Sequence, residues 1–134
     1  MQPKGRNFQS AKEVMSRGLV FVDGMATARE AVELMRKEKV EALIVKKRYP
    51  QDAYGIVVMK DFIQGVIVPD RTSDEVNVYE IMTKPVISVP AGMDVRYVAR
   101  LLIRAGLRIA PVEENGEYIG MISLSTLIID NVLF

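Results

Sequence analysis

Apolar residues follow two different spacings along this chain, and each spacing occurs twice. Short runs rich in β-branched residues, LVFV at 19–22 and VISV at 86–89, end at turn-forming residues and predict strands. A helical stripe follows each run, with apolar residues at positions 28, 31, 32 and 35 and again at 95, 98, 99 and 102. Thr27 and Glu30 have the spacing of a capping box, and Asp94 is placed to cap the second helix.

Two more strand-like runs follow each predicted helix. They are ALIV and GIVV in the first half, and IAPV and IGMI in the second. Asn115-Gly116 lies between the last two runs and predicts a hairpin. A second, shorter helix is expected to begin near Met59 and near Leu124. Each half therefore predicts the order strand, helix, strand, strand, helix.

The two halves form an internal repeat. A shift of 67 residues places Val14-Met15-Ser16 on Ile81-Met82-Thr83, and after two extra residues in the first copy Gly55 aligns with Gly120. We expect one repeat at 10–67, a linker at 68–77 and a second repeat at 78–130. One such unit cannot cover both faces of its small sheet, so the two are expected to pack together. Duplication for stability alone accounts for the apolar pattern but not for the polar residues that also repeat.

Composition narrows the chemistry. The chain has 134 residues, an apolar fraction of 49% and a net charge of +1. These values favour an oligomer and give no field that attracts nucleic acid. No window is long and apolar enough to span a membrane, and the N-terminus lacks a secretory signal, so we expect a cytoplasmic protein. Cysteine is absent, which removes a thiol nucleophile and a thiolate metal site. Histidine is absent too, which removes the commonest general base and the commonest transition-metal ligand, and both absences argue against an enzyme.

Two phrases at equivalent positions carry the candidate chemistry. GIVVMKD at 55–61 and GMISLST at 120–126 each begin with a glycine, which permits close approach of the backbone. The fourth position lies where the second short helix begins, near free amides that favour phosphate. The seventh position lies one turn into that helix. The first phrase has Val58 and Asp61 at these positions, and the second has Ser123 and Thr126.

The paired openings EVMSRGLVFV and EIMTKPVISV, the APV of the second copy and the two glycine phrases together resemble the cystathionine β-synthase (CBS) domain pair, over about residues 10–128. The resemblance implies an α/β (α+β) fold of tandem βαββα repeats, with two small sheets packed around a pseudo-twofold axis. It implies a regulatory module that binds AMP, ADP, ATP or S-adenosylmethionine in clefts between the repeats. The family's ribose motif is similar to Gly-apolar-apolar-Thr/Ser-x-x-Asp, from which both phrases depart. The contacts implied are Ser16, Arg17, Leu19, Gly55, Val57, Asp61, Thr83, Lys84, Val86, Arg108, Ala110, Gly120, Ile122, Ser123 and Thr126.

We group these residues by repeat. A first cleft holds Ser16 and Arg17 with Asp61 and suits ribose, and a second holds Thr83 and Lys84 with the hydroxyls of the second phrase and suits phosphate. Other interpretations stay open. Ser123 has the position of an ordinary N-cap and Asp61 that of a helix-dipole partner. Lys84 and Arg17 are candidates for solvated side chains, and Arg108, at a strand edge, is a further candidate for a phosphate contact.

Two function classes remain. One is a sensor in which two chains form a dimer, an adenosyl ligand changes its conformation and a separate effector protein reads the change. The other is a ligand-free docking or dimerisation module. No obligatory cofactor, metal set, nucleophile–base pair or Walker loop is indicated. The loop Lys46-Lys47-Arg48 aligns with Glu113-Glu114, so the two loops carry opposite charge. One interpretation is two solvated loops. The other is a head-to-tail dimer in which the basic loop of one chain lies near the acidic loop of its partner.

Overall fold

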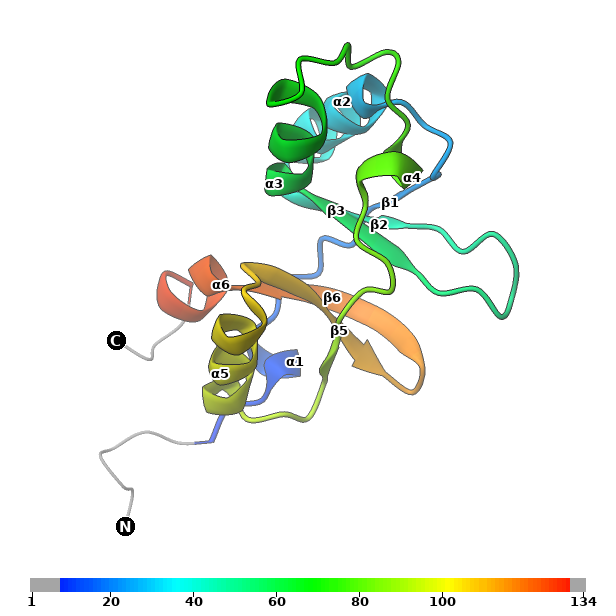
Figure 1. Ribbon diagram of the computed structural model, residues 1–134. Coiled ribbons are helices and arrows are strands. Elements are labelled where there is room, and N and C mark those ends of the chain that lie inside the picture. Colours follow the sequence, from blue (N-terminus) through cyan, green and yellow to red (C-terminus); the bar gives the residue numbers. More distant parts are fainter. Residues whose placement is uncertain (1–7, 131–134) are drawn as a thin grey trace. The chain divides into compact units, whose positions relative to one another are not determined.

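The computed structural model describes residues 8–130 as two compact units, each with a three-stranded sheet (Figure 1). Unit 1 consists of residues up to Leu19 together with residues from Ile87 onward, and unit 2 runs from Val20 to Val86. Each unit therefore combines the opening segment of one repeat with the body of the other. The predicted fold class, tandem α+β repeats with small sheets and covering helices, is confirmed.

Unit 2 contains strands β1 (Phe21–Val22), β2 (Ala42–Val45) and β3 (Gly55–Val58), in that order across the sheet. β1 pairs with β2 in parallel, and β2 pairs with β3 in antiparallel register, with Ile44 opposite Ile56. Helix α2 (Ala28–Glu38) joins the first two strands, and α3 (Met59–Phe62) follows β3 and continues as the π-helix η2 (Ile63–Ile67). Helix α4 (Val78–Ile81) comes from the opening of the second repeat. The core of unit 2 lies between these helices and the sheet.

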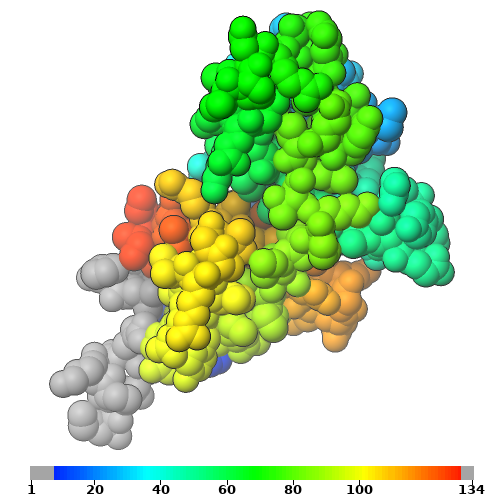
Figure 2. Space-filling view, in the orientation of Figure 1, coloured from blue at the N-terminus to red at the C-terminus, as the bar shows by residue number. Residues whose placement is uncertain are grey.

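Unit 1 repeats this plan with β4 (Val89–Pro90), β5 (Ile109–Glu114) and β6 (Glu117–Ser123). Helix α5 (Val95–Ala105) joins the first two strands, and α6 (Leu124–Ile128) follows the last. Helix α1 (Ala11–Val14), from the opening of the first repeat, contacts α5 and β6 (Figure 1). The outer face of α5 is exposed at Tyr97 and Ile103, and this helix lies on the visible surface (yellow, Figure 2). Its inner face supplies Val95, Val98 and Leu102 to the core.

Local sequence signals account for the main helices and for the hairpin. Thr27 caps α2 in a complete capping box with Glu30, and the Asp94 carboxylate accepts a hydrogen bond from the amide of Arg96 at the start of α5. Both helices end in a left-handed residue, Lys39 and Gly106, which lie 67 positions apart. Asn115 and Gly116 both have positive φ, as the predicted two-residue hairpin turn requires.

The first strand of each repeat is shorter than predicted. Only Phe21–Val22 of LVFV is a strand, and of VISV only Val89 belongs to one. Each run spans the boundary between units, because Leu19 belongs to unit 1 and Val20 to unit 2, and Val86 belongs to unit 2 and Ile87 to unit 1. A run that passes from one unit to the other cannot pair along its whole length with one sheet.

Candidate functional site

Two matched backbone bridges attach the opening segment of each repeat to the sheet of the other. Ser16 exchanges amide–carbonyl hydrogen bonds of 2.8 Å with Met121 in β6, and Thr83 exchanges bonds of 2.9 Å with Ile56 in β3. A second matched pair, Ser10 with Asp94 and Asn77 with Thr27, brings helix N-caps together. Each residue of one bridge is the repeat equivalent of a residue in the other. The exchange is therefore a property of the repeat itself.

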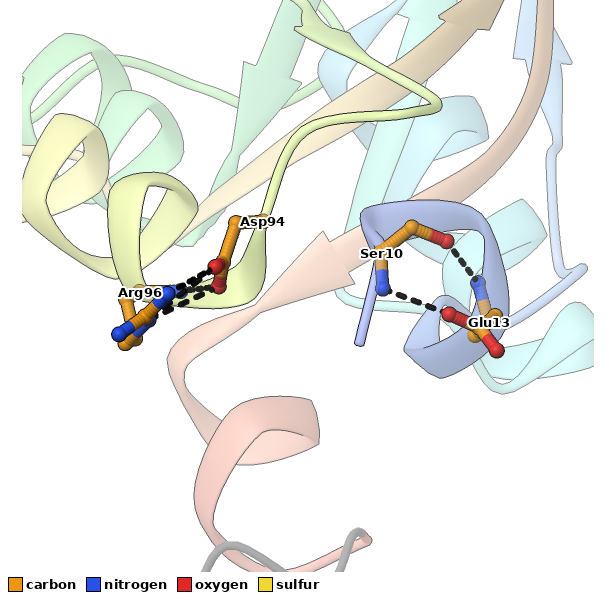
Figure 3. A network of polar contacts seen from close by, with 4 residues as sticks. All are labelled: Ser10, Glu13, Asp94 and Arg96. Atoms are coloured by element: carbon orange, nitrogen blue, oxygen red, sulfur yellow. Dashed lines mark hydrogen bonds and ion pairs between the residues drawn. The ribbon is translucent and has the colours of Figure 1, made fainter. Parts of the chain in front are cut away.

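The N-cap cluster of unit 1 shows how the opening segment is held. Ser10 and Glu13 form a complete capping box around the first turn of α1, with the Ser10 amide 2.8 Å from the Glu13 carboxylate (Figure 3). The Asp94 carboxylate accepts from Arg96 through both its backbone amide and its guanidinium (Figure 3). The hydrogen bond to the Asp94 carboxylate, together with its negative charge, raises the pKa of the Arg96 guanidinium. Backbone hydrogen bonds join the opening segment to the start of α5, from the Ala11 amide to the Met93 carbonyl at 2.8 Å and from the Val95 amide to the Gln9 carbonyl at 2.9 Å.

The expected grouping of the site residues by repeat is wrong for the openings. Ser16 lies against β6, in the unit that also holds Ser123 and Thr126. Thr83 lies against β3, in the unit that holds Asp61. Sequence alignment pairs equivalent residues, but it does not show that each opening segment packs with the other repeat.

The two glycines serve protein packing. A Cβ added to Gly120 would lie 2.5 Å from the Ser16 carbonyl oxygen and 2.6 Å from Met15 Sδ. A Cβ on Gly55 would lie 2.8 Å from Met82 Sδ and 3.3 Å from the Thr83 carbonyl oxygen. The sequence predicted that a ligand would come close to the backbone at these glycines. In the structure it is the exchanged opening segment that comes close to the sheet at both positions.

Asp61 is the acidic residue of the first glycine phrase and lies in unit 2. It is half-buried in the first turn of α3, and its Oδ2 accepts a 2.8 Å hydrogen bond from the amide of Val58, the helix N-cap. Burial raises the pKa of the Asp61 carboxyl, against the opposing effects of the Val58 amide and Lys60. The carboxylate thus satisfies the amide of the N-cap residue, whereas the Val58 side chain caps no amide of the helix. The helix-dipole interpretation of Asp61 agrees with this geometry.

Lys84 is neither a solvated side chain nor a free cation. Its ammonium group lies 2.8 Å from the carboxylate of Asp52, a buried residue of the loop between β2 and β3. Arg48 donates to the same carboxylate through its backbone amide and its Nε, at 2.9 and 3.1 Å. Hydrogen bonds from Arg48 and Lys84 hold the pKa of Asp52 far below its usual range. Sequence reasoning missed Asp52, although it is the single acidic residue in the loop KKRYPQDAY.

In unit 1 the second phrase is occupied by its own capping bonds. The Ser123 hydroxyl accepts from the Thr126 amide at 3.1 Å and lies 2.9 Å from the Thr126 hydroxyl. Ser123 is therefore an N-cap, as the simpler interpretation has it. Ser16, Arg17 and Arg108 are exposed in the same unit, and the backbone carbonyl of Arg108 accepts from the amide of Leu124.

Three of the implied contacts are core residues. Val57, Ala110 and Ile122 have side chains that are at most 1% exposed and belong to the two apolar cores. They cannot contact a ligand through those side chains. Leu19 and Val86 are half-buried where the chain passes between units, and the Val86 amide donates to the Tyr54 carbonyl at 3.1 Å.

The acidic loop proposed to meet a basic loop of a second chain has partners within unit 1. The Glu113 carboxylate accepts from the Ser88 hydroxyl at 2.9 Å, and the Glu114 carboxylate pairs with Lys12 at 3.0 Å. In the basic loop, Lys47 lies over the ring of Tyr54. These contacts use the charges locally and weaken the case for a loop-to-loop contact between chains.

Residues 8–130 contain no helix that is long and apolar enough to cross a membrane. Within the same range, no group of three or more acidic, histidine or cysteine side chains is arranged to hold a metal ion.

Duplicated three-stranded sheets with exchanged openings and paired glycine phrases define a tandem-repeat α+β module. The CBS domain model matches residues 11–67 and 78–129, and the chain belongs to the CBS domain family. It is 31% identical over 105 residues to the mitochondrial CBS domain-containing protein CBSX3 of Arabidopsis thaliana, covering 76% of this chain and 51% of that protein. It is 28% identical over 120 residues to the protein MK0525 of Methanopyrus kandleri, covering 89% and 61%. The chain thus spans less than two thirds of either relative.

Solved structures agree with this assignment. The structure of a hexameric CBS-CP12 protein from bloom-forming cyanobacteria matches with a TM-score of 0.86 and 38% identity, over 90% of this chain and 70% of that one. A conserved protein from Pyrococcus horikoshii matches with a TM-score of 0.80 and 28% identity, over 89% of each chain.

Proposed function

We propose that the chain is a regulatory module that binds an adenosine-containing ligand, either an adenine nucleotide or S-adenosylmethionine. The observation that carries the proposal is that two residues from different repeats meet the same strand of unit 2. The Asp61 carboxylate accepts from the amide of Val58 at the end of β3, and the Thr83 backbone pairs with Ile56 within β3. An adenosyl ligand presents a ribose diol, whose two hydroxyls can donate to a carboxylate such as that of Asp61. A threonine hydroxyl can hydrogen-bond to the ligand's other polar groups. The ligand would then contact both repeats, and its differential affinity would favour one arrangement of the module over another.

The proposal extends to self-association and to signalling. The chain would act as a homodimer in the cytoplasm and report to a separate effector protein, without catalysis and without an obligatory cofactor. The hexameric assembly named for the cyanobacterial CBS-CP12 protein supports self-association in this family.

A thermal-shift screen with AMP, ADP, ATP, S-adenosylmethionine and NAD tests ligand binding. A ligand at 100 times its Kd stabilises the folded state by about 2.7 kcal/mol. We expect the shift to be lost in Asp61→Asn, whose amide oxygen still accepts from Val58 but which lacks the charge for the ribose hydroxyls. Asp70→Asn, an exposed position in the same unit, is the matched control. A shift that survives Asp61→Asn would show that the site lies elsewhere.

The alternative function is a ligand-free docking module. It is favoured by the methionine sulfur atoms that fill the space beside Gly55 and Gly120, and by the hydroxyl pair of Ser123 and Thr126. No thermal shift with any adenosine compound at millimolar concentration would support this alternative over the sensor.

A further inference from the structure

The loop between β2 and β3 differs in length from its repeat equivalent. It comprises residues 46–54, which lie outside the sheet and project from it (Figure 1). In unit 1 the equivalent segment, residues 113–119, continues β5 and β6 up to a two-residue turn at Asn115 and Gly116. The repeat can therefore close this hairpin with two residues, and the sheet of unit 2 does not require the longer loop.

The same loop concentrates positive charge. Lys46, Lys47 and Arg48 follow one another, and all three are exposed. Asp52 is the single acidic residue of the loop, and its carboxylate is already shared by Arg48 and Lys84. The loop therefore carries an excess of positive charge, although the net charge of the whole chain is only +1. An anionic partner would be attracted to this part of the surface.

A buried carboxylate fixes the conformation of the loop. The Asp52 side chain is 5% exposed, and it accepts hydrogen bonds from the amide and Nε of Arg48 and from Lys84, which is 32 residues further along the chain. The Asp52 amide donates to the Tyr49 carbonyl at 2.9 Å. A buried ion pair adds little net stability compared with well-packed apolar side chains. The main effect of this one is to hold the cationic residues in one arrangement.

Two tyrosine rings lie against the cations. The Lys47 Nζ is 4.8 Å from the centroid of the Tyr54 ring, and the Arg48 Cζ is 5.5 Å from the centroid of the Tyr49 ring. Contact with a ring face positions a cation without neutralising its charge. The same contacts cover ring faces that a single-stranded nucleic acid would need for the stacking of its bases. Arginine and tyrosine are enriched at the centres of protein interfaces, so this composition favours a protein partner.

We propose that this basic loop is a docking surface for an acidic segment of another protein. The carboxylates of that segment pair with Lys46, Lys47 and the guanidinium of Arg48, which has five N–H donors and directs its Nε at Asp52. Tyr49, which is 51% exposed, supplies apolar contact area. Because Asp52 holds the loop in place beforehand, the partner does not have to order it on binding. The four contacting residues are not among the implied adenosyl contacts, so either proposal can fail without the other.

Fluorescence anisotropy with a labelled peptide of alternating glutamate and serine tests the proposal. We expect binding, and the same peptide with glutamine in place of glutamate should not bind. The double variant Lys46→Gln with Lys47→Gln should weaken binding about fivefold or more, which corresponds to about 1 kcal/mol. The matched control is Lys37→Gln with Lys39→Gln, which removes the same charge from exposed positions at the end of α2 in the same unit. This control should bind the peptide like the wild type.

Asp52→Asn distinguishes a preformed surface from a general attraction of anions. The variant loses a negative charge and releases Arg48 and Lys84 from their ion pairs, so a general attraction predicts tighter binding. A preformed surface predicts binding that is weaker by about threefold or more, because the peptide then has to order the loop. Dispersed amide spectra at the temperature of the titration show whether each variant is folded.

Several results would overturn the proposal. They are absence of binding at millimolar peptide, equal weakening in the control, tighter binding by Asp52→Asn, and tighter binding of a single-stranded oligonucleotide or of phosphatidylserine vesicles than of the peptide. Light scattering tests the remaining occupant. A dimer that dissociates in Lys46→Gln with Lys47→Gln would make a second copy of this chain the partner and would overturn the proposal as well.

Discussion

Replacing Gly120 with alanine tests the exchange of opening segments at its tightest point. The added Cβ would meet the Ser16 carbonyl oxygen at 2.5 Å and Met15 Sδ at 2.6 Å. The first of these atoms belongs to the backbone and accepts a 2.8 Å hydrogen bond from the Met121 amide, while the Ser16 amide donates a second 2.8 Å bond to the Met121 carbonyl. The oxygen therefore cannot move without disturbing that bridge. Overpacking of this kind costs about 1 to 3 kcal/mol. At about 3 °C per kcal/mol for a protein of this length, the Tm should fall by about 3 to 9 °C.

Two other glycines provide the comparison. At Gly55 the close atom is the flexible Met82 Sδ, and the backbone oxygen of Thr83 is 3.3 Å away, so Gly55→Ala should cost less than Gly120→Ala. At Gly92 an added Cβ meets nothing within 4 Å, and Gly92→Ala should be neutral or slightly stabilising. Urea denaturation and thermal melts followed by circular dichroism measure the order.

Hydrogen exchange localises the effect of Gly120→Ala. The amides of Ser16 and Met121 should lose protection, while those of Thr83 and Ile56 should keep it, because only the bridge in unit 1 is disturbed. If Gly120→Ala were as stable as Gly92→Ala, or if the Ser16 amide stayed as protected as in the wild type, the glycine would not be required by the exchanged segment.

Three further predictions concern stability. Asp52→Asn should lower Tm at pH 7, and the Tm difference from wild type should shrink as pH falls below about 4. The reason is that the pKa of Asp52 is depressed in the folded protein, so its contribution to stability is lost only on acidification. A pH series of melts in which the Tm difference stays constant would contradict this. Thr27→Ala should cost about 1 kcal/mol in urea denaturation through loss of the capping box, and Thr27→Ser should restore most of it; equal stability of the two variants would refute the assignment. Lys39→Gly should stabilise the folded protein by about 1 kcal/mol, because Lys39 has a left-handed φ of 58°. Lys37→Gly, inside the same helix, should destabilise it by a similar amount. Stability changes of the same sign for both variants would argue against strain at Lys39.

Most of the secondary structure of the chain followed from local signals. The stripes that formed α2 and α5, the caps at Thr27 and Asp94 and the hairpin at Asn115 depend on residues that are close in sequence, and all are present. The short helices α1 and α4 were not predicted, although Ser10 with Glu13 and Asn77 with Glu80 have capping-box spacing.

The arrangement of the candidate site could be predicted only in part. Ser123 and Asp61 were correctly placed at helix starts, since capping is local. The partner of Lys84 and the neighbour of Ser16 are 32 and 105 residues away in sequence, and no periodicity in a single sequence reports such pairs. Repeat alignment favoured the wrong grouping because it shows which residues are equivalent and not which are in contact.

The matched bridges of Ser16 with Met121 and of Thr83 with Ile56 have a consequence for how such a protein can be divided. A fragment that ends in the linker keeps the sheet of β1, β2 and β3 but lacks Thr83, which bridges to that sheet. It also keeps Ser16 but lacks β6, the strand to which Ser16 bridges. Two such fragments, or two copies of one of them, are complementary in the manner of a domain swap, so cleavage in the linker should leave an associated pair and not two independent proteins.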